Sequence, residues 1–195
     1  MGMRIFLAGA TGVIGVRLVP LLVAAGHQVT GMTRSPGKVK GLRALGAEAV
    51  VCDVYDTTGL RAAVVAARPE VVLHQLTDLP DEQSAIPEFR AANARIRREG
   101  TRNLLAAARA AGAGRFLAQS VAWELHGEAA VPKEELERSV LAAGGVVLRY
   151  GTLYGPGTYF PQAPPPPPRV QVDEAARRTV GALEAPSGIL TIVDG

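Results

Sequence analysis

The chain has 195 residues, a hydrophobic fraction of 48% and a formal net charge of +3, with 21 basic and 18 acidic residues spread along it. This length supports one domain with a sizeable core and argues against two full domains. The charges form no basic block, which argues against nucleic acid as a partner. A single cysteine, Cys52, excludes an internal disulfide, and no apolar run approaches the length of a membrane-spanning helix. Because the sequence also shows no signal-peptide pattern, we expect a cytoplasmic protein with no membrane partner.

The N-terminal segment places three glycines between a strand and a helix. Residues 4–8 form an apolar run of strand length, and apolar residues recur at helical spacing from residue 13 to residue 26. In such a turn the first glycine permits a sharp exit from the strand, the second lets backbone amides approach a pyrophosphate, and the third allows close packing of the helix. The free amides and the positive end of the helix then hold the anion. The predicted phosphate-binding residues are Gly9, Thr11, Gly12, Val13, Ile14 and Gly15.

The segment Gly9-Ala-Thr-Gly-Val-Ile-Gly15 resembles the opening of extended and atypical short-chain dehydrogenase/reductases, the NAD(P)-dependent epimerase/dehydratase superfamily. Residues 100–112, 116–123 and 147–157 carry the same resemblance. It implies an α/β fold with a doubly wound parallel sheet, the Rossmann fold, and a cofactor lying across the C-terminal ends of the strands. It also implies a single NAD(P)-binding domain over residues 1–195, with residues 155–195 a remnant of the C-terminal substrate-binding part and the substrate-capping subdomain reduced.

The residue after the second predicted strand, residues 28–33, decides which dinucleotide fits. NAD sites place an acidic residue there to accept hydrogen bonds from the adenosine ribose. This chain has Arg34 instead. Because a guanidinium pairs bidentately with phosphate, Arg34 predicts NADP as the cofactor, with NAD less suited. A surface arginine in a polar loop is the alternative.

Two further strand ends complete the predicted cofactor site. Asp53 and Val54 follow the third predicted strand, residues 49–52, and the resemblance implies that the carboxylate accepts from the adenine amine while the valine packs on the ring. Leu76 and Thr77 follow the fourth predicted strand, residues 71–75, where the resemblance implies contact with the nicotinamide ribose.

His74 lies near the end of that fourth strand and suggests a general base, because an ordinary histidine pKa is about 6.5. No acidic partner stands nearby in the sequence. A histidine whose hydrogen bonds are satisfied within the strand end is the commoner case.

The longest predicted helix covers residues 88–111 and precedes a fifth strand over residues 115–120. In the resembling family this helix often contributes to a four-helix dimer interface, which implies a homodimer. The segment after it resembles the one that carries the active-site serine or threonine, so Ser120 is expected to hydrogen-bond a substrate carbonyl or hydroxyl. Many relatives carry two consecutive hydroxyl residues, and the second position here is Val121. Ser120 could also be no more than a strand-end hydroxyl.

The proton-donating motif of the family, Tyr-x-x-x-Lys, does not occur in the sequence. In that motif the ammonium lowers the phenol pKa from about 10, so that a proton moves while hydride moves to or from nicotinamide. If Glu137 matches the glutamate that follows the family's lysine, then Lys133 is that lysine and Ala129 replaces the tyrosine. Otherwise Lys133 is a solvated residue in the first turn of a helix predicted over residues 133–143.

Tyr150 and Tyr154 are the remaining candidate proton donors. They follow a sixth strand over residues 146–149, in a segment that resembles the place where the family's loop and substrate meet. Neither is placed by the sequence within reach of the nicotinamide.

The C-terminal part is short. Residues 164–168 are five prolines, which predict a stiff polyproline II spacer, with a ligand for an aromatic groove as the alternative. A strand over residues 169–172, a helix capped by Asp173 and a final strand over residues 188–194 resemble the family's C-terminal elements. We therefore expect a cleft that is open or completed by another chain.

These features predict an NADP-dependent oxidoreductase or epimerase/dehydratase-type enzyme acting on a small hydroxyl or carbonyl substrate. The missing motif leaves two alternatives open: a redox-neutral lyase, isomerase or cyclase of the same fold, and a non-catalytic dinucleotide sensor. A serine hydrolase is disfavoured because no Gly-x-Ser-x-Gly elbow is present. No metal site is expected, since His27, His74 and His126 lack ligand spacing.

Overall fold

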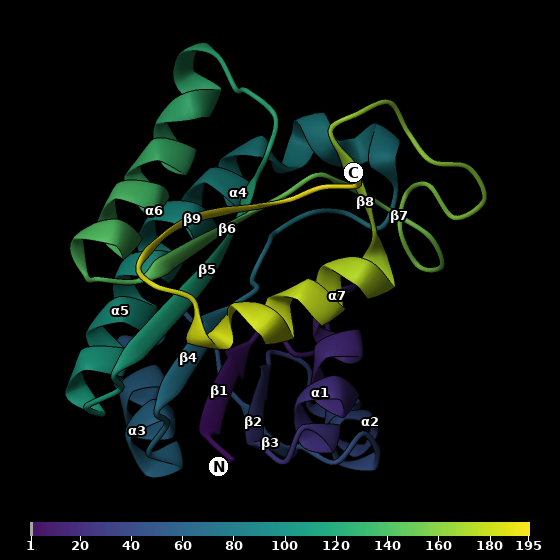
Figure 1. Ribbon diagram of the computed structural model, residues 1–195. Helices are drawn as coiled ribbons and strands as arrows, with labels where there is room; N and C mark the ends of the chain where they lie inside the picture. The colour runs from purple at the N-terminus through teal and green to yellow at the C-terminus, as the bar shows by residue number, and fades with distance from the viewer. Residues whose placement is uncertain (1) are drawn as a thin grey trace.

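The computed structural model describes residues 2–195 and contains a seven-stranded parallel sheet flanked by helices (Figure 1). Its strand order is β3-β2-β1-β4-β5-β6-β9, and every neighbouring pair is parallel. The strands are β1 (Arg4–Ala8), β2 (Gln28–Thr33), β3 (Glu48–Val51), β4 (Val71–His74), β5 (Arg115–Val121), β6 (Val146–Tyr150) and β9 (Gly188–Ile192). The order reverses between β1 and β4, which is the point where open α/β sheets bind their ligands. The predicted doubly wound fold is confirmed.

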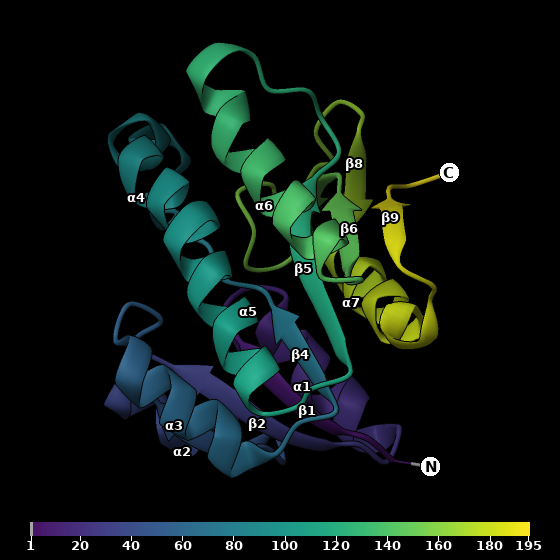
Figure 2. The ribbon, with the colours of Figure 1, turned by 90° about the vertical axis from the view of Figure 1, so that its left-hand side faces the viewer.

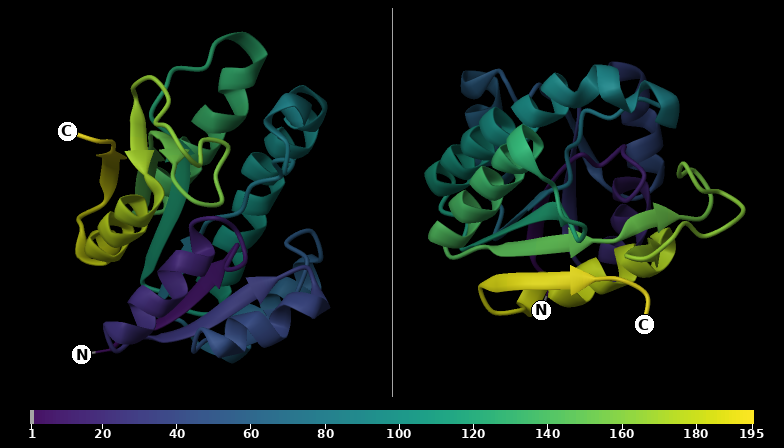
Figure 3. Two further views of the ribbon diagram at one scale, coloured as in Figure 1. Left: turned by 90° about the vertical axis from the view of Figure 1, so that its right-hand side faces the viewer. Right: turned by 90° about the horizontal axis from the view of Figure 1, so that it is seen from above.

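Helices cover both faces of this sheet. They are α1 (Gly15–Ala24), α2 (Val39–Ala44), α3 (Thr57–Ala67), α4 (Arg90–Arg95), α5 (Thr101–Ala110), α6 (Ala130–Ala142) and α7 (Val172–Gly181). One core joins the sheet to α1, α2 and α7, and a second joins it to α3, α5 and α6. Seen from above, the teal and green helices lie on one side of the sheet and the yellow α7 on the other (Figure 3).

The apolar run of β1 explains why helices pack on both faces of the sheet. Its side chains alternate between the faces, so that Ile5 and Leu7 enter the core under α1 while Phe6 and Ala8 enter the core under α5. All four are at most 1% exposed. A strand buried on both faces reads as a continuous apolar run, as parallel strands do.

The predicted long helix is present, but it is not uniform. Helical structure runs from a 3-10 segment at Gln83–Phe89 through α4, a π-helical segment at Ile96–Gly100 and into α5, so that one long helix crosses the sheet (Figure 2). Gly100 is buried, and a Cβ there would lie 3.2 Å from Cδ1 of Ile96. Single π turns are frequent at functional sites, and the period of the hydrophobic residues alone does not predict them.

Residues after β6 form a second, small sheet. It pairs β7 (Thr152–Tyr154) with β8 (Arg169–Gln171) in parallel. The proline run between them bends at residues 166–168, and the buried Pro165 accepts a 2.8 Å hydrogen bond from Nη1 of Arg169. The prediction of a stiff, extended spacer was therefore wrong, because the run folds back against β8.

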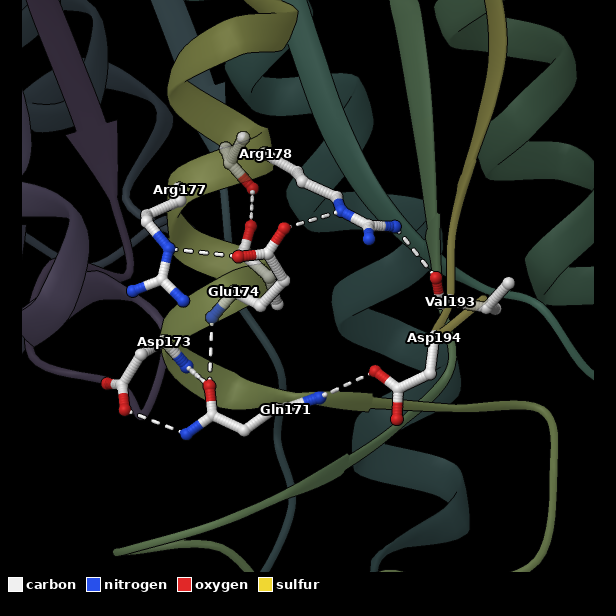
Figure 4. Close-up of polar contacts among 9 residues, drawn as sticks. Gln171, Asp173, Glu174, Arg177, Arg178, Val193 and Asp194 are labelled. Atoms are coloured by element: carbon white, nitrogen blue, oxygen red, sulfur yellow. Dashed lines mark hydrogen bonds and ion pairs between the residues drawn. The ribbon is translucent and has the colours of Figure 1, made fainter.

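The cap of α7 also differs from the prediction (Figure 4). Oε1 of Gln171 accepts from the amides of Asp173 at 2.7 Å and Glu174 at 2.9 Å, so Gln171 is the N-cap. Asp173 lies in the first turn, where Nε2 of Gln171 donates to it at 2.8 Å. A long amide side chain thus fills the role expected of a short carboxylate.

Candidate nucleotide-binding site

Two glycines shape the turn after β1, because nearby backbone atoms leave no room for a side chain at either position. Gly9 has φ of +90°, and a Cβ on it would lie 2.5 Å from the carbonyl oxygen of Gln75. A Cβ on Gly15 would lie 2.2 Å from the carbonyl oxygen of Gly9. Neither position accepts a side chain without backbone movement, so these glycines set the shape of the turn.

Gly12 is less confined than Gly9 and Gly15. A Cβ there would meet only the carbonyl oxygen of Gly9, at 3.3 Å, and the residue is exposed. The following helix α1 begins at Gly15 with no side-chain cap and no acidic residue in its first turn. Unfilled amides at a helix N-terminus beside an open glycine fit an incoming phosphate. This cradle suits the pyrophosphate of a dinucleotide.

The other residues of the turn hold it in place. Ile14 is buried in the core, and Val13 is partly buried against it. Oγ1 of Thr11 lies 3.3 Å from Oγ1 of Thr33 at the end of β2. The turn is therefore tied to β2, from which the predicted phosphate ligand Arg34 extends.

At the ends of β2 and β3 the structure places Arg34, Asp53 and Val54. Arg34 is 53% exposed, and its Nη2 lies 2.8 Å from Oδ1 of Asp78. Oδ1 of Asp53 accepts a 2.9 Å hydrogen bond from the amide of Tyr55, while the residue itself stays exposed. Val54 is 1% exposed and packs beneath the long helix. Of these residues, Arg34 and Asp53 present polar atoms at the surface where adenosine would lie.

The loop after β4 is fixed by hydrogen bonds from two strands. Nδ1 of His74 accepts from the amide of Leu76 at 3.2 Å, and Nε2 of Gln119 donates to the carbonyl of Leu76 at 3.0 Å. Thr77 follows and is exposed. The loop therefore presents Thr77 at the C-terminal edge of the sheet.

His74 itself is fully buried and hydrogen-bonded at both ring nitrogens. Its Nε2 lies 3.0 Å from Oγ1 of Thr101 on α5, and its Nδ1 is occupied by the loop amide. Burial lowers the pKa of this imidazole to about 4. The geometry is that of a neutral histidine satisfied within the core.

Ser120 and Lys133 meet at a buried carboxylate. The hydroxyl of Ser120 donates to Oε1 of Glu137 at 2.6 Å, and Nζ of Lys133 lies 3.2 Å from the same oxygen. Arg149 of β6 binds both carboxylate oxygens, at 3.0 and 2.6 Å. Burial by itself raises the pKa of Glu137, but the hydrogen bonds from Arg149, Ser120 and Lys133 outweigh it and lower the pKa to about 2. The Lys133 side chain is 12% exposed.

The two tyrosines lie in different surroundings. Tyr150 is 3% exposed, and its hydroxyl lies 2.6 Å from Oγ1 of Thr179 and 3.1 Å from Nε2 of Gln75. Burial raises its pKa to about 12 against the effect of these hydrogen bonds. Tyr154 lies on β7, and a hydrogen bond with Asp194 raises its pKa.

A loop at residues 155–160 bridges the region of the glycine turn and the loop after β4 through hydrogen bonds. The sequence did not predict this bridge. Arg17 of α1 donates to the carbonyl of Pro156 and lies 2.7 Å from Oδ1 of Asp173 on α7. At the other end of the loop, the hydroxyl of Tyr159 donates to the carbonyl of Pro80. The two anchors of the loop join residues that are 139 and 79 positions apart in the sequence, so no local pattern could have found them.

Residues 2–195 were also searched for a metal site and for a membrane-spanning helix. No three histidine, cysteine, aspartate or glutamate side chains in this range gather closely enough to hold a metal ion. Over the same range, no helix is both long and apolar enough to cross a bilayer.

Comparison with known sequences shows the family of the chain. Residues 9–144 match the sequence model of a family described as NAD(P)H-binding. The chain belongs to this NAD(P)H-binding family. The match begins at Gly9, the first glycine of the turn, and extends beyond Glu137. The predicted relation to NAD(P)-binding proteins is confirmed, whereas the choice between NAD and NADP is not decided by this match.

Two curated relatives of the chain are oxidoreductases by name. The chain is 43% identical over 182 residues to a 3-diazoavenalumate denitrifying reductase of Streptomyces sp., with 81% of this chain and 59% of that protein covered. It is 30% identical over 116 residues to a 3-beta-hydroxysteroid dehydrogenase of Mycolicibacterium neoaurum, with 58% of this chain and 31% of that protein covered. The chain thus spans at most 59% of the length of these two relatives.

Solved structures share the fold at low sequence identity. The UDP-glucose 4-epimerase of Thermus thermophilus, in complex with NAD, gives a TM-score of 0.79 at 22% identity and covers 99% of this chain and 78% of that one. The UDP-Glc/GlcNAc 4-epimerase of Campylobacter jejuni gives 0.80 at 15% identity and covers 100% and 79%. These likenesses confirm the doubly wound α/β fold.

Proposed function

We propose that the protein is an NADP(H)-dependent reductase of a small organic acceptor. The observation that carries the proposal is the glycine turn, where Gly9 and Gly15 are required by the fold and the exposed Gly12 lies beside an uncapped helix. Membership of the NAD(P)H-binding family and the reductase at 43% identity support the same chemistry.

NADP is proposed over NAD because Arg34 stands at the end of β2. Its guanidinium is 53% exposed, so an arriving 2′-phosphate can reach it. Arginine binds phosphate through paired N–H donors. The ribose hydroxyls of NAD are uncharged, so they are weaker acceptors for the guanidinium than a 2′-phosphate is. Asp53, with Val54 behind it, would lie beside the adenine.

At the substrate end we propose that Ser120, Lys133, Tyr150 and Tyr154 act as a polar lining rather than as a Tyr-x-x-x-Lys pair. Ser120 and Lys133 are engaged with Glu137, which supports a positioning role for both. The buried Tyr150 hydroxyl is used by Thr179 and Gln75, so it supports the floor of the site. Leu76 and Thr77 would line the nicotinamide ribose.

The sequence has no Tyr-x-x-x-Lys motif to supply a proton, which favours an acceptor that needs none. Bound nicotinamide supplies a hydride, and when hydride replaces a diazonium group on carbon, the C–N electron pair leaves with dinitrogen and no proton is taken up. The relative named as a denitrifying reductase of a diazo compound supports this acceptor class. A carbonyl acceptor, in contrast, requires both hydride and a proton.

The test is to follow the near-ultraviolet absorbance of NADPH with a benzenediazonium salt and, separately, with an aromatic ketone. We expect enzyme-dependent loss of NADPH with the diazonium salt, matched by one arene per NADPH, above the rate without protein. Loss of NADPH with the ketone alone would keep the reductase and replace the acceptor class. Substrate conversion without loss of NADPH would instead support a redox-neutral lyase, isomerase or cyclase. If NADPH binds and no acceptor is converted, a dinucleotide sensor is the better description.

A further inference from the structure

The ion pair between Arg34 and Asp78 crosses the cofactor site. Arg34 follows β2, whereas Asp78 lies in the loop after β4, and β1 lies between these two strands in the sheet. Nη2 of Arg34 and Oδ1 of Asp78 are 2.8 Å apart. The pair therefore passes over the C-terminal end of β1, where the glycine turn begins.

The two partners are held very differently. The Asp78 side chain is 15% exposed, and its second oxygen lies 3.5 Å from the hydroxyl of Tyr55. The Tyr55 ring is covered by Arg95, whose guanidinium carbon lies 3.9 Å from the ring centroid. Arg34 is 53% exposed and binds Asp78 through one of its nitrogens. The carboxylate is thus a fixed part of the site, and the guanidinium is the partner free to turn toward a ligand.

We propose that Asp78 sets the preference between NADP and NAD by competing with the 2′-phosphate for Arg34. This inference rests on the proposed function, since it assumes that a dinucleotide occupies the glycine turn. A 2′-phosphate carries close to two negative charges at neutral pH and must share the guanidinium with the largely buried carboxylate of Asp78. NAD brings no charge to this place, and its ribose hydroxyls can donate to the carboxylate. Asp78 therefore holds down the affinity for NADP without an equal effect on NAD.

The experiment is calorimetric titration of NADP, NAD and 2′,5′-ADP into the wild-type protein and four variants. The variants are Asp78→Asn, Asp81→Asn, Arg34→Ala and the double variant Arg34→Ala/Asp78→Asn. Asp81 is an exposed acid of the same loop, so its substitution removes the same charge away from Arg34. Thermal unfolding of each variant verifies that it is folded.

We expect Asp78→Asn to bind NADP and 2′,5′-ADP about tenfold tighter, which corresponds to about 1.4 kcal/mol, and to bind NAD within about twofold of wild type. Asp81→Asn should leave the NADP to NAD ratio unchanged, and Asp78→Asn should have almost no effect on that ratio when Arg34 is absent. An unchanged ratio in Asp78→Asn, with both nucleotides still bound, would overturn the inference and leave the proposed function standing. If no nucleotide binds any variant, the proposed function fails, and the inference fails with it.

Discussion

The hydroxyl of Ser120 donates a 2.6 Å hydrogen bond to Glu137, and both residues are buried. The same carboxylate binds Lys133 of its own helix and Arg149 of the neighbouring strand. Glu137 therefore connects α6 to β5 and β6 at the end of the sheet where the substrate would lie. The substrate-side residues predicted from sequence depend on this one carboxylate for their positions.

Replacing Glu137 by glutamine should destabilise the fold. The change leaves the charges of Lys133 and Arg149 without a carboxylate, and breaking a buried ion pair costs about 3 kcal/mol or more. Glu135→Gln is the matched control, because Glu135 is 41% exposed in its pair with Arg98 and such pairs contribute about 1 kcal/mol at most. Urea unfolding at neutral pH measures both, and equal losses in the two variants would contradict the central role of Glu137.

The buried His74 should make the fold less stable as the pH falls from about 6.5 to about 4. Its folded-state pKa is about 4, below the ordinary value of 6.5, so in this range the unfolded chain takes up a proton that the folded chain does not. The full effect is about 3 kcal/mol, and above pH 6.5 the residue has no effect on the slope. Unfolding free energies measured over this range should show a flatter slope in His74→Gln. The exposed His126→Gln should keep the wild-type slope. A wild-type slope in His74→Gln would contradict this account, because it would mean that His74 takes up a proton as readily in the folded chain as in the unfolded one.

Gly9→Ala should unfold more easily by about 2 kcal/mol, the typical cost of one residue held in a strained backbone conformation. Its φ of +90° and the 2.5 Å approach to the carbonyl of Gln75 both act against a side chain. Gly41→Ala provides a control of opposite sign, since a Cβ there meets nothing within 4 Å and alanine stabilises a helix interior by about 1 kcal/mol. Thermal unfolding of the two variants should therefore move in opposite directions.

Gln171→Ala should cost about 1 kcal/mol, because two amides at the start of α7 lose their acceptor. For a chain of this size the expected fall in Tm is about 2–4 °C. Arg177→Ala, which removes an exposed ion pair with Glu174 in the same helix, should change Tm much less. A larger effect from Arg177 would mean that the cap contributes little to this helix.

The strands and the glycine turn could be predicted because their signals are local. The β1 run and the spacing of Gly9, Gly12 and Gly15 each depend on neighbouring residues, and the structure has β1 where it was predicted. Strand ends differ by one residue, as with β3 and β6, because side-chain pattern fixes a face more firmly than an end.

The polar contacts that shape the site could not be predicted in the same way. Asp78 reaches Arg34 across 44 residues, and Arg17 reaches Asp173 across 156. The cap of α7 was assigned to Asp173 because short carboxylates are common caps, and only the packing of β8 shows that Gln171 is placed to act first. The π segment at Ile96–Gly100 likewise has the apolar pattern of an ordinary helix.

The most direct test of the account is calorimetric titration of NADP into wild-type protein and Gly12→Ala. The new methyl group would meet one protein atom, the carbonyl oxygen of Gly9 at 3.3 Å, which a shift of a few tenths of an ångström relieves. The variant should therefore unfold within about 2 °C of wild type, whereas the methyl group would occupy part of the proposed phosphate cradle. We predict that wild type binds NADP and that Gly12→Ala binds it at least about tenfold more weakly. Equal binding by the two proteins, or no binding by wild type, would contradict the claim that this turn holds a dinucleotide.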